Sequence, residues 1–131
     1  MISTKDLKAA ARAYRRDATV LFEADRYDGA YYLCGYAVEL ALKARICQTL
    51  RWPGFPQTSG EFKGRQSLKT HDLEDLLQFT GVGERVRTKH MADWSFVLNW
   101  NPEKRYQKAG NSTQQEAADM VASAKRLLAA L

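Results

Sequence analysis

The stretch from Asp28 to Leu50 restricts the fold of this 131-residue chain more than any other part of the sequence. On a helix of 3.6 residues per turn it is apolar on nearly every side, and Glu39, Lys43 and Arg45 interrupt its longest apolar run. A helix that is apolar on most sides is typical of a buried position. We therefore expect this helix to lie at the centre of a helical bundle or against a second subunit.

A seam of small side chains runs along this helix. Its members are four or three residues apart, which keeps them on one face: Ala30, Cys34, Ala37, Ala41 and Ala44. Small side chains let another helix approach closely. Together with the scarcity of polar residues on the other faces, the seam predicts a homodimer.

The remaining apolar residues repeat at helical spacing in four further segments, and we find no alternation typical of strands. Helices are expected over about 4–25, 71–79 with Thr70 as N-cap, 84–98 and 113–130. Prolines and glycines between about 51 and 69 predict an irregular loop. The sequence thus predicts an all-α protein, an antiparallel up-and-down bundle of four to five helices in a single domain spanning 1–131.

Composition limits the classes of function. The net charge of +5 permits an anionic partner but does not require one. Cys34 and Cys47 are too far apart on one helix to form a disulfide, which fits a reducing cytoplasm, and the sequence predicts neither a signal peptide nor a membrane-spanning segment. His71 and His90 are the two histidines, with no metal-binding motif, so neither a metal nor a cofactor is expected.

Glu39 and Lys43 stand out because two charged residues, four apart, interrupt an apolar helix. Buried charges are costly unless they are paired or used. One interpretation is a structural salt bridge, and the other is a polar patch that lines a cleft. We predict that Glu39, Lys43, His71 and Arg105 converge on one cleft beside Tyr106, where Arg105 would suit a phosphate-bearing ligand.

Three segments resemble the HEPN domain family (higher eukaryotes and prokaryotes nucleotide-binding), in its small prokaryotic stand-alone type. The run from Tyr32 to Ala44, with Ala37, Glu39 and Lys43, resembles the central helix of that family. His71-Asp72-Leu73 with Leu76 and Leu77 is similar to its H-x-L-x-x-L segment. The third segment, Trp100-Asn101-Pro102-Glu103-Lys104-Arg105-Tyr106, is similar to its W-x-x-E-x-R-Y ending.

This resemblance implies a helical bundle that dimerises and that acts on nucleotides or RNA. It also implies a place in a toxin–antitoxin or defence module, with a nucleotidyltransferase-type protein as partner. Ribonucleases of the family carry an R-x4-6-H motif. Arg85 and His90 satisfy its spacing, although Val86 stands where a polar residue is expected.

Three functions follow as hypotheses. The first is a HEPN-like protein that binds a nucleotide or RNA, with Glu39, Lys43, His71, Arg105 and Tyr106 as ligand-binding residues. The second is a metal-independent endoribonuclease with Arg85 and His90 as catalytic residues, in which His90 would move a proton and Arg85 would stabilise the charged phosphorane. The third is a purely structural interaction module.

Overall fold

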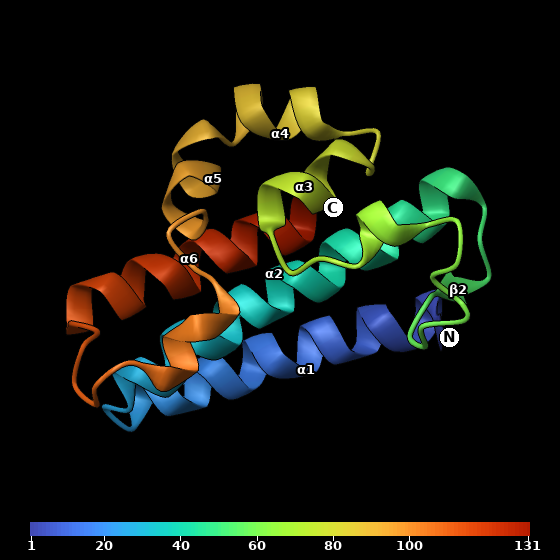
Figure 1. Ribbon diagram of the computed structural model, residues 1–131. Coiled ribbons are helices and arrows are strands. Elements are labelled where there is room, and N and C mark those ends of the chain that lie inside the picture. Colours follow the sequence, from blue (N-terminus) through green and yellow to red (C-terminus); the bar gives the residue numbers. More distant parts are fainter.

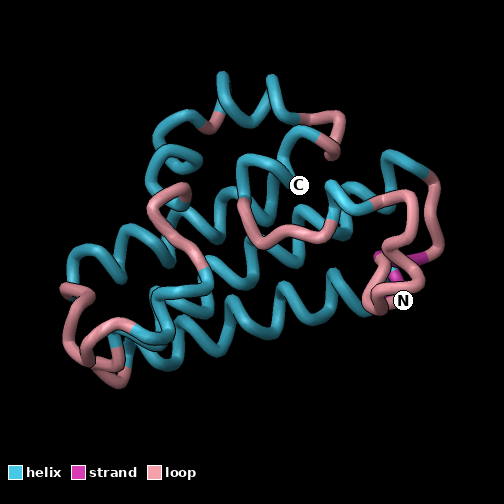
Figure 2. The backbone as a smooth tube through the Cα atoms, in the orientation of Figure 1, coloured by secondary structure: helices cyan, strands magenta, loops and turns pink.

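The computed structural model describes the backbone of residues 1–131 and every side chain except those of Lys104 and Arg105. Its elements, in chain order, are β1 (Ile2–Ser3), α1 (Thr4–Glu23), α2 (Tyr27–Leu50), β2 (Gly54–Phe55), the 3-10 helix η1 (Gln66–Leu68), α3 (Leu73–Gln78), α4 (Gly83–Lys89), α5 (Met91–Val97), the 3-10 helix η2 (Pro102–Tyr106) and α6 (Gln114–Ala130). The predicted all-α class is confirmed, with two strands of two residues each as the exception (Figure 2).

Three long helices form the body of the molecule. Helices α1, α2 and α6 contact one another, and α1 runs antiparallel to both of the others (Figure 1). The chain returns from the end of α2 to the start of α6 through α3, α4 and α5, which lie along one side of the long helices (Figure 1). Of these short helices, α3 contacts α2, whereas α5 contacts α6 and α4 contacts α5.

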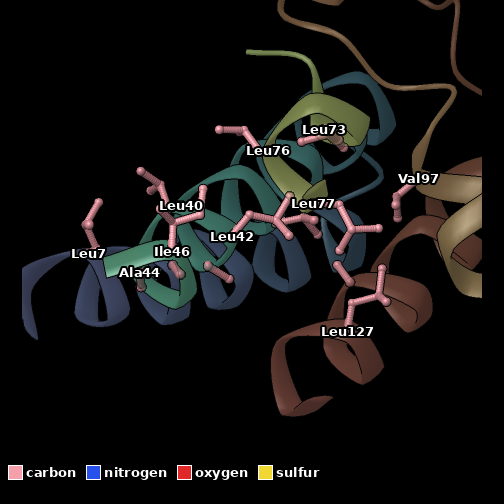
Figure 3. Packing of buried hydrophobic residues seen from close by; sticks show 14 of the residues in the cluster. Leu7, Leu40, Leu42, Ala44, Ile46, Leu73, Leu76, Leu77, Val97 and Leu127 are labelled. Atoms are coloured by element: carbon pink, nitrogen blue, oxygen red, sulfur yellow. The ribbon is translucent and has the colours of Figure 1, made fainter. Parts of the chain in front are cut away.

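Helix α2 lies at the centre of the core, as its all-round apolar pattern predicts. Thirteen of its residues are buried, and Leu42 belongs to the same buried cluster as Leu77 of α3 and Leu127 of α6 (Figure 3). The seam of small residues is buried inside this single chain, where α1 and α6 approach α2 closely. The seam is therefore occupied by helices of the same chain and gives no support to a homodimer.

The single helix expected over 84–98 is two helices, α4 and α5, which meet at a break at His90. No proline or glycine marks this break. Helix α5 turns there toward α6, and Asp93 near its start pairs with α6. The prediction of an uninterrupted helix was wrong because these contacts with distant residues decide the break.

The segment 51–69 is irregular, as expected, but it is packed against the rest of the molecule. Phe55, Phe62 and Leu68 are buried. Phe55 in β2 pairs with Ile2 in β1, which ties the segment to the start of α1. Strands of two residues are too short to show an alternating pattern in the sequence, so these two were not predicted.

An ion pair joins α5 to α6. The guanidinium of Arg126 donates to both carboxylate oxygens of Asp93 at 2.7–3.0 Å, and the hydroxyl of Ser123 donates to one of them at 3.0 Å. The hydrogen bond from Arg126 is the main reason why the pKa of Asp93 lies below its ordinary value, although the partial burial of Asp93 opposes this.

We expect this pair to make folding sensitive to acid. Because the pKa of Asp93 is lower in the folded state, its stabilising effect is present above the unfolded-state pKa of about 4 and is lost as pH falls through the lower folded-state pKa. Asp93→Asn should lower the free energy of unfolding at pH 7 by about 1–2 kcal/mol. It should also flatten the loss of stability below about pH 4. Urea melts at a series of pH values measure both effects.

The matched control is Asp17→Asn, because Asp17 is an exposed aspartate on α1. If Asp93→Asn kept the acid dependence of the wild-type protein, the ion pair would not contribute to that dependence.

Candidate functional site

The Glu39 carboxylate is almost completely buried, at 1% exposure, and two basic side chains hold it. Lys43 Nζ donates to Glu39 Oε2 at 3.0 Å, one turn along α2. His71 Nδ1 lies 3.0 Å from Oε1 and 3.2 Å from Oε2. A carboxylate only accepts hydrogen bonds, so Nδ1 carries the hydrogen in this contact. The sequence-based convergence of Glu39, Lys43 and His71 is therefore present in the structure.

Local structure fixes each member of this group. Glu39 and Lys43 share a face of α2, and the Lys43 ammonium also lies 5.2 Å from the centre of the Phe55 ring. His71 precedes α3, whose N-cap is Asp72 and not the expected Thr70. The Asp72 carboxylate accepts from the Asp75 backbone N–H at 3.0 Å. The residues before α3 are thus held beside α2.

A pocket of about 700 Å³ opens over Glu39 and His71. It lies between α2, the start of α3 and the segment from Leu98 to Glu103. Its volume falls in the range of pockets that hold small organic ligands, about 300–1,000 Å³. Glu39 therefore forms a salt bridge and also lines a cleft, so both interpretations drawn from the sequence apply to it.

Aromatic rings form one wall of the pocket. Tyr32 and Tyr36 lie one turn apart on α2 with nearly parallel rings, 9° between their planes and 6.5 Å between their centres. The ring of Trp100 lies 5.9 Å from that of Tyr32, and the indole N–H of Trp100 donates to the Tyr32 carbonyl oxygen at 3.0 Å. Flat rings beside an open pocket can stack on a planar ligand.

Trp100 reaches this position because Gly35 has no side chain. A Cβ placed on Gly35 would lie 2.2 Å from the indole ring, far inside van der Waals contact. The glycine in the middle of α2 therefore creates the space into which Trp100 fits. We did not single out Gly35 or the tyrosines as site residues from the sequence, although Tyr32, Tyr36 and Glu39 are spaced to share one helix face.

Glu74 positions the opposite wall. Its carboxylate accepts from Arg87 Nε on α4 and from the indole N–H of Trp94 on α5, both at 2.9 Å. Burial by itself would raise the pKa of Glu74, but the hydrogen bonds from Arg87 and Trp94 outweigh it and the pKa is lowered. One residue of α3 thus connects three short helices beside the pocket.

The charged side chains described around the pocket are mainly acidic. Four carboxylates line it, from Glu39, Asp72, Glu74 and Glu103, and His71 is the basic residue among the described lining side chains. From the sequence we expected instead a cleft that suits a phosphate-bearing ligand. The described lining suits a ligand face that donates hydrogen bonds better than it suits a phosphate.

The remaining site residues predicted from the sequence are Arg105, Tyr106, Arg85 and His90. The Arg105 side chain lies outside the described residues. Tyr106 is 71% exposed in η2 and is not among the described lining residues. Arg85, on α4, donates to the carbonyl oxygen of Ala130 at 2.6 Å. In the described part of the chain no hydrogen bond joins Arg85 to His90, and neither of them lines the pocket.

Comparison with known proteins gives one family match. Residues 4–60 match the family model of the HEPN domain. This match supports membership of the chain in the HEPN family. Searches of curated proteins and of solved structures give no match. The matched region comprises α1, α2 and β2, and thus carries Tyr32, Tyr36, Glu39 and Lys43.

Two further observations concern metal ions and membranes. Among the described side chains, no group of three or more His, Cys, Asp or Glu residues is arranged to hold a metal ion. No helix in the described part of the chain has the length and apolar character needed to cross a membrane. The match to the HEPN domain supports a function related to nucleotides or RNA in general terms.

Proposed function

We propose that this HEPN-like protein binds nucleotides or single-stranded RNA and that the pocket beside Glu39 receives a nucleobase. The aromatic wall next to a buried, doubly held carboxylate is the observation that carries this proposal. Unpaired bases commonly stack on tyrosine and tryptophan rings, and the amino groups of bases donate hydrogen bonds to carboxylates. A base with an exposed amino group suits this lining.

The buried Glu39 would not work as a freely moving acceptor, because Lys43 and His71 fix it from two sides. Such fixation favours binding, since little side-chain freedom remains to be lost when a ligand arrives. His71 is 63% exposed at its side chain and lies between Glu39 and solvent. We propose that it contacts the ligand at the pocket mouth and that Arg105 and Tyr106 also bind the ligand.

Replacing Tyr32 with leucine tests this proposal. Stacking of a base on an aromatic ring is worth about 1–3 kcal/mol, so Tyr32→Leu should weaken nucleotide binding by about 5- to 150-fold. Isothermal titration calorimetry with AMP, GMP, CMP and UMP measures the loss. Tyr27→Leu is the matched control, because Tyr27 is a half-buried tyrosine at the start of α2 that does not line this pocket.

Equal affinities for Tyr32→Leu and the wild-type protein, with both proteins folded, would place the nucleotide elsewhere.

A nucleotidyltransferase-type partner, a toxin–antitoxin or defence role and a homodimer remain part of the proposal. Their support is the match of residues 4–60 to the HEPN domain. Co-purification with the product of the adjacent reading frame tests the partner, and sedimentation at micromolar concentration tests the dimer.

A metal-independent endoribonuclease is the second candidate. The break at His90 favours it, because on a continuous helix residues five apart point about 140° away from each other. The hydrogen bond from Arg85 to Ala130 counts against it, since it directs that guanidinium to α6. RNA cleavage that resists EDTA and disappears in His90→Ala would establish this activity in place of simple binding.

A further inference from the structure

A second pocket, of about 210 Å³, lies where α1, α2 and α6 meet. Its apolar lining includes Ala41 and Ala44, from the seam of small residues on α2. The members of α2 that line it lie on average about half a turn around the helix from Glu39. The pocket is therefore on the opposite side of α2 from the aromatic pocket.

All charged side chains described around this second pocket are cationic. They are Lys8 and Arg12 from α1 and Arg45 from α2, with Gln48 as a neutral polar neighbour. No carboxylate side chain is among its described lining residues. Three basic groups around one small hollow attract an anion, and the low-dielectric alanine floor strengthens that attraction.

Arg45 gives the second, independent observation. Its Nε is shielded from solvent and has no hydrogen-bond partner among the described residues. Buried N–H groups without a partner are rare because the lost hydrogen bond to water is not replaced, and each of them calls for a water or ion that fills the gap. An oxyanion in the pocket would supply the missing acceptor.

We propose that this pocket is a phosphate-binding site in which Arg45 Nε–H and the side chains of Lys8 and Arg12 hold one phosphate group. The volume admits a phosphate but is smaller than the pockets that usually enclose whole organic ligands. The phosphate belongs either to an RNA backbone that crosses this face or to a small phosphorylated molecule. Binding here does not depend on the aromatic pocket.

Titration of the ¹⁵N-labelled protein with inorganic phosphate tests the site directly. The Nε–Hε signal of Arg45 should shift with a saturable dependence on phosphate concentration. Arg12→Gln should raise the apparent dissociation constant at least threefold, and its exposed position on α1 makes it a mild substitution for the fold. Arg26→Gln, an equally exposed arginine at the α1–α2 turn, changes the net charge identically and should leave the constant unchanged.

A linear shift without saturation, or an equal effect of Arg12→Gln and Arg26→Gln, would overturn the site. In Tyr32→Leu the Arg45 signal should still respond to phosphate. A loss of base binding in the aromatic pocket can therefore be distinguished from a loss of phosphate binding at Arg45.

A ten-nucleotide single-stranded RNA separates the two sources of phosphate. If the RNA backbone occupies the pocket, Arg12→Gln should reduce the slope of log K against log salt concentration by about 0.7, whereas Arg26→Gln should not. Equal slopes in both variants, together with a saturable response to inorganic phosphate, would assign the site to small phosphorylated molecules. Equal slopes without that response would refute the proposal.

Discussion

Lys43→Met should lower the free energy of unfolding by about 3–5 kcal/mol, because it leaves the buried Glu39 carboxylate without its main counter-ion. His71 alone is a weaker partner, since its side chain is mostly exposed. The exposed Lys89→Met on α4 is the control and should change the stability by less than about 0.5 kcal/mol. Chemical denaturation with a two-state fit measures the free energy of unfolding of the wild-type protein and of both variants.

The double variant Glu39→Leu/Lys43→Met tests whether the ion pair contributes to nucleotide binding or to stability alone. Apolar replacement of both members of a buried ion pair is often neutral, so most of the lost stability should return. Nucleotide binding should stay at least tenfold weaker, because the pocket then lacks the held carboxylate. A stable double variant with unchanged binding would assign the pair to structure alone.

Trp100→Ala is the second change with a large expected effect, a loss of about 3–5 kcal/mol in the free energy of unfolding. The indole is 3% exposed, and its removal opens a hollow beside α2 and cancels the hydrogen bond to the Tyr32 carbonyl. Binding of a nucleobase should fall as well, because Trp100 forms part of the aromatic wall.

Gly35→Ala provides the internal check on this contact. In the wild-type background the added methyl group collides with the indole and should cost about 1–3 kcal/mol or more. In the Trp100→Ala background the collision is absent, and the better helix propensity of alanine should stabilise the protein by up to about 1 kcal/mol. Additive effects in this double-mutant cycle would mean that Trp100 does not lie on Gly35.

The helices of the body follow from local sequence, and the turns between short helices do not. Helix α2 was predicted because its residues are apolar on nearly every side, and Ser3 caps α1 by accepting from the Asp6 N–H at 3.1 Å. The break at His90 lacks such a signal. It is fixed by contacts with distant residues, such as Asp93 with Arg126 and Trp94 with Glu74, which no local pattern reveals.

The candidate site was predictable in part for the same reason. Charges at Glu39 and Lys43 are conspicuous in an apolar helix, and the cost of burying them predicts partners such as His71. The acidic balance of the pocket depends on Asp72, Glu74 and Glu103, which the chain brings to α2 from segments far away in the sequence. The role of Gly35 is apparent only from its contact with Trp100, which lies 65 positions away in the sequence.

The binding of a base in the aromatic pocket is tested most directly by intermolecular nuclear Overhauser effects in a complex with a mononucleotide. We expect contacts from the ring protons of Tyr32, Tyr36 and Trp100 to the base protons, with the ribose nearer to His71. Contacts confined to another surface, or the absence of any complex at millimolar nucleotide, would contradict the assignment of this pocket to a nucleobase.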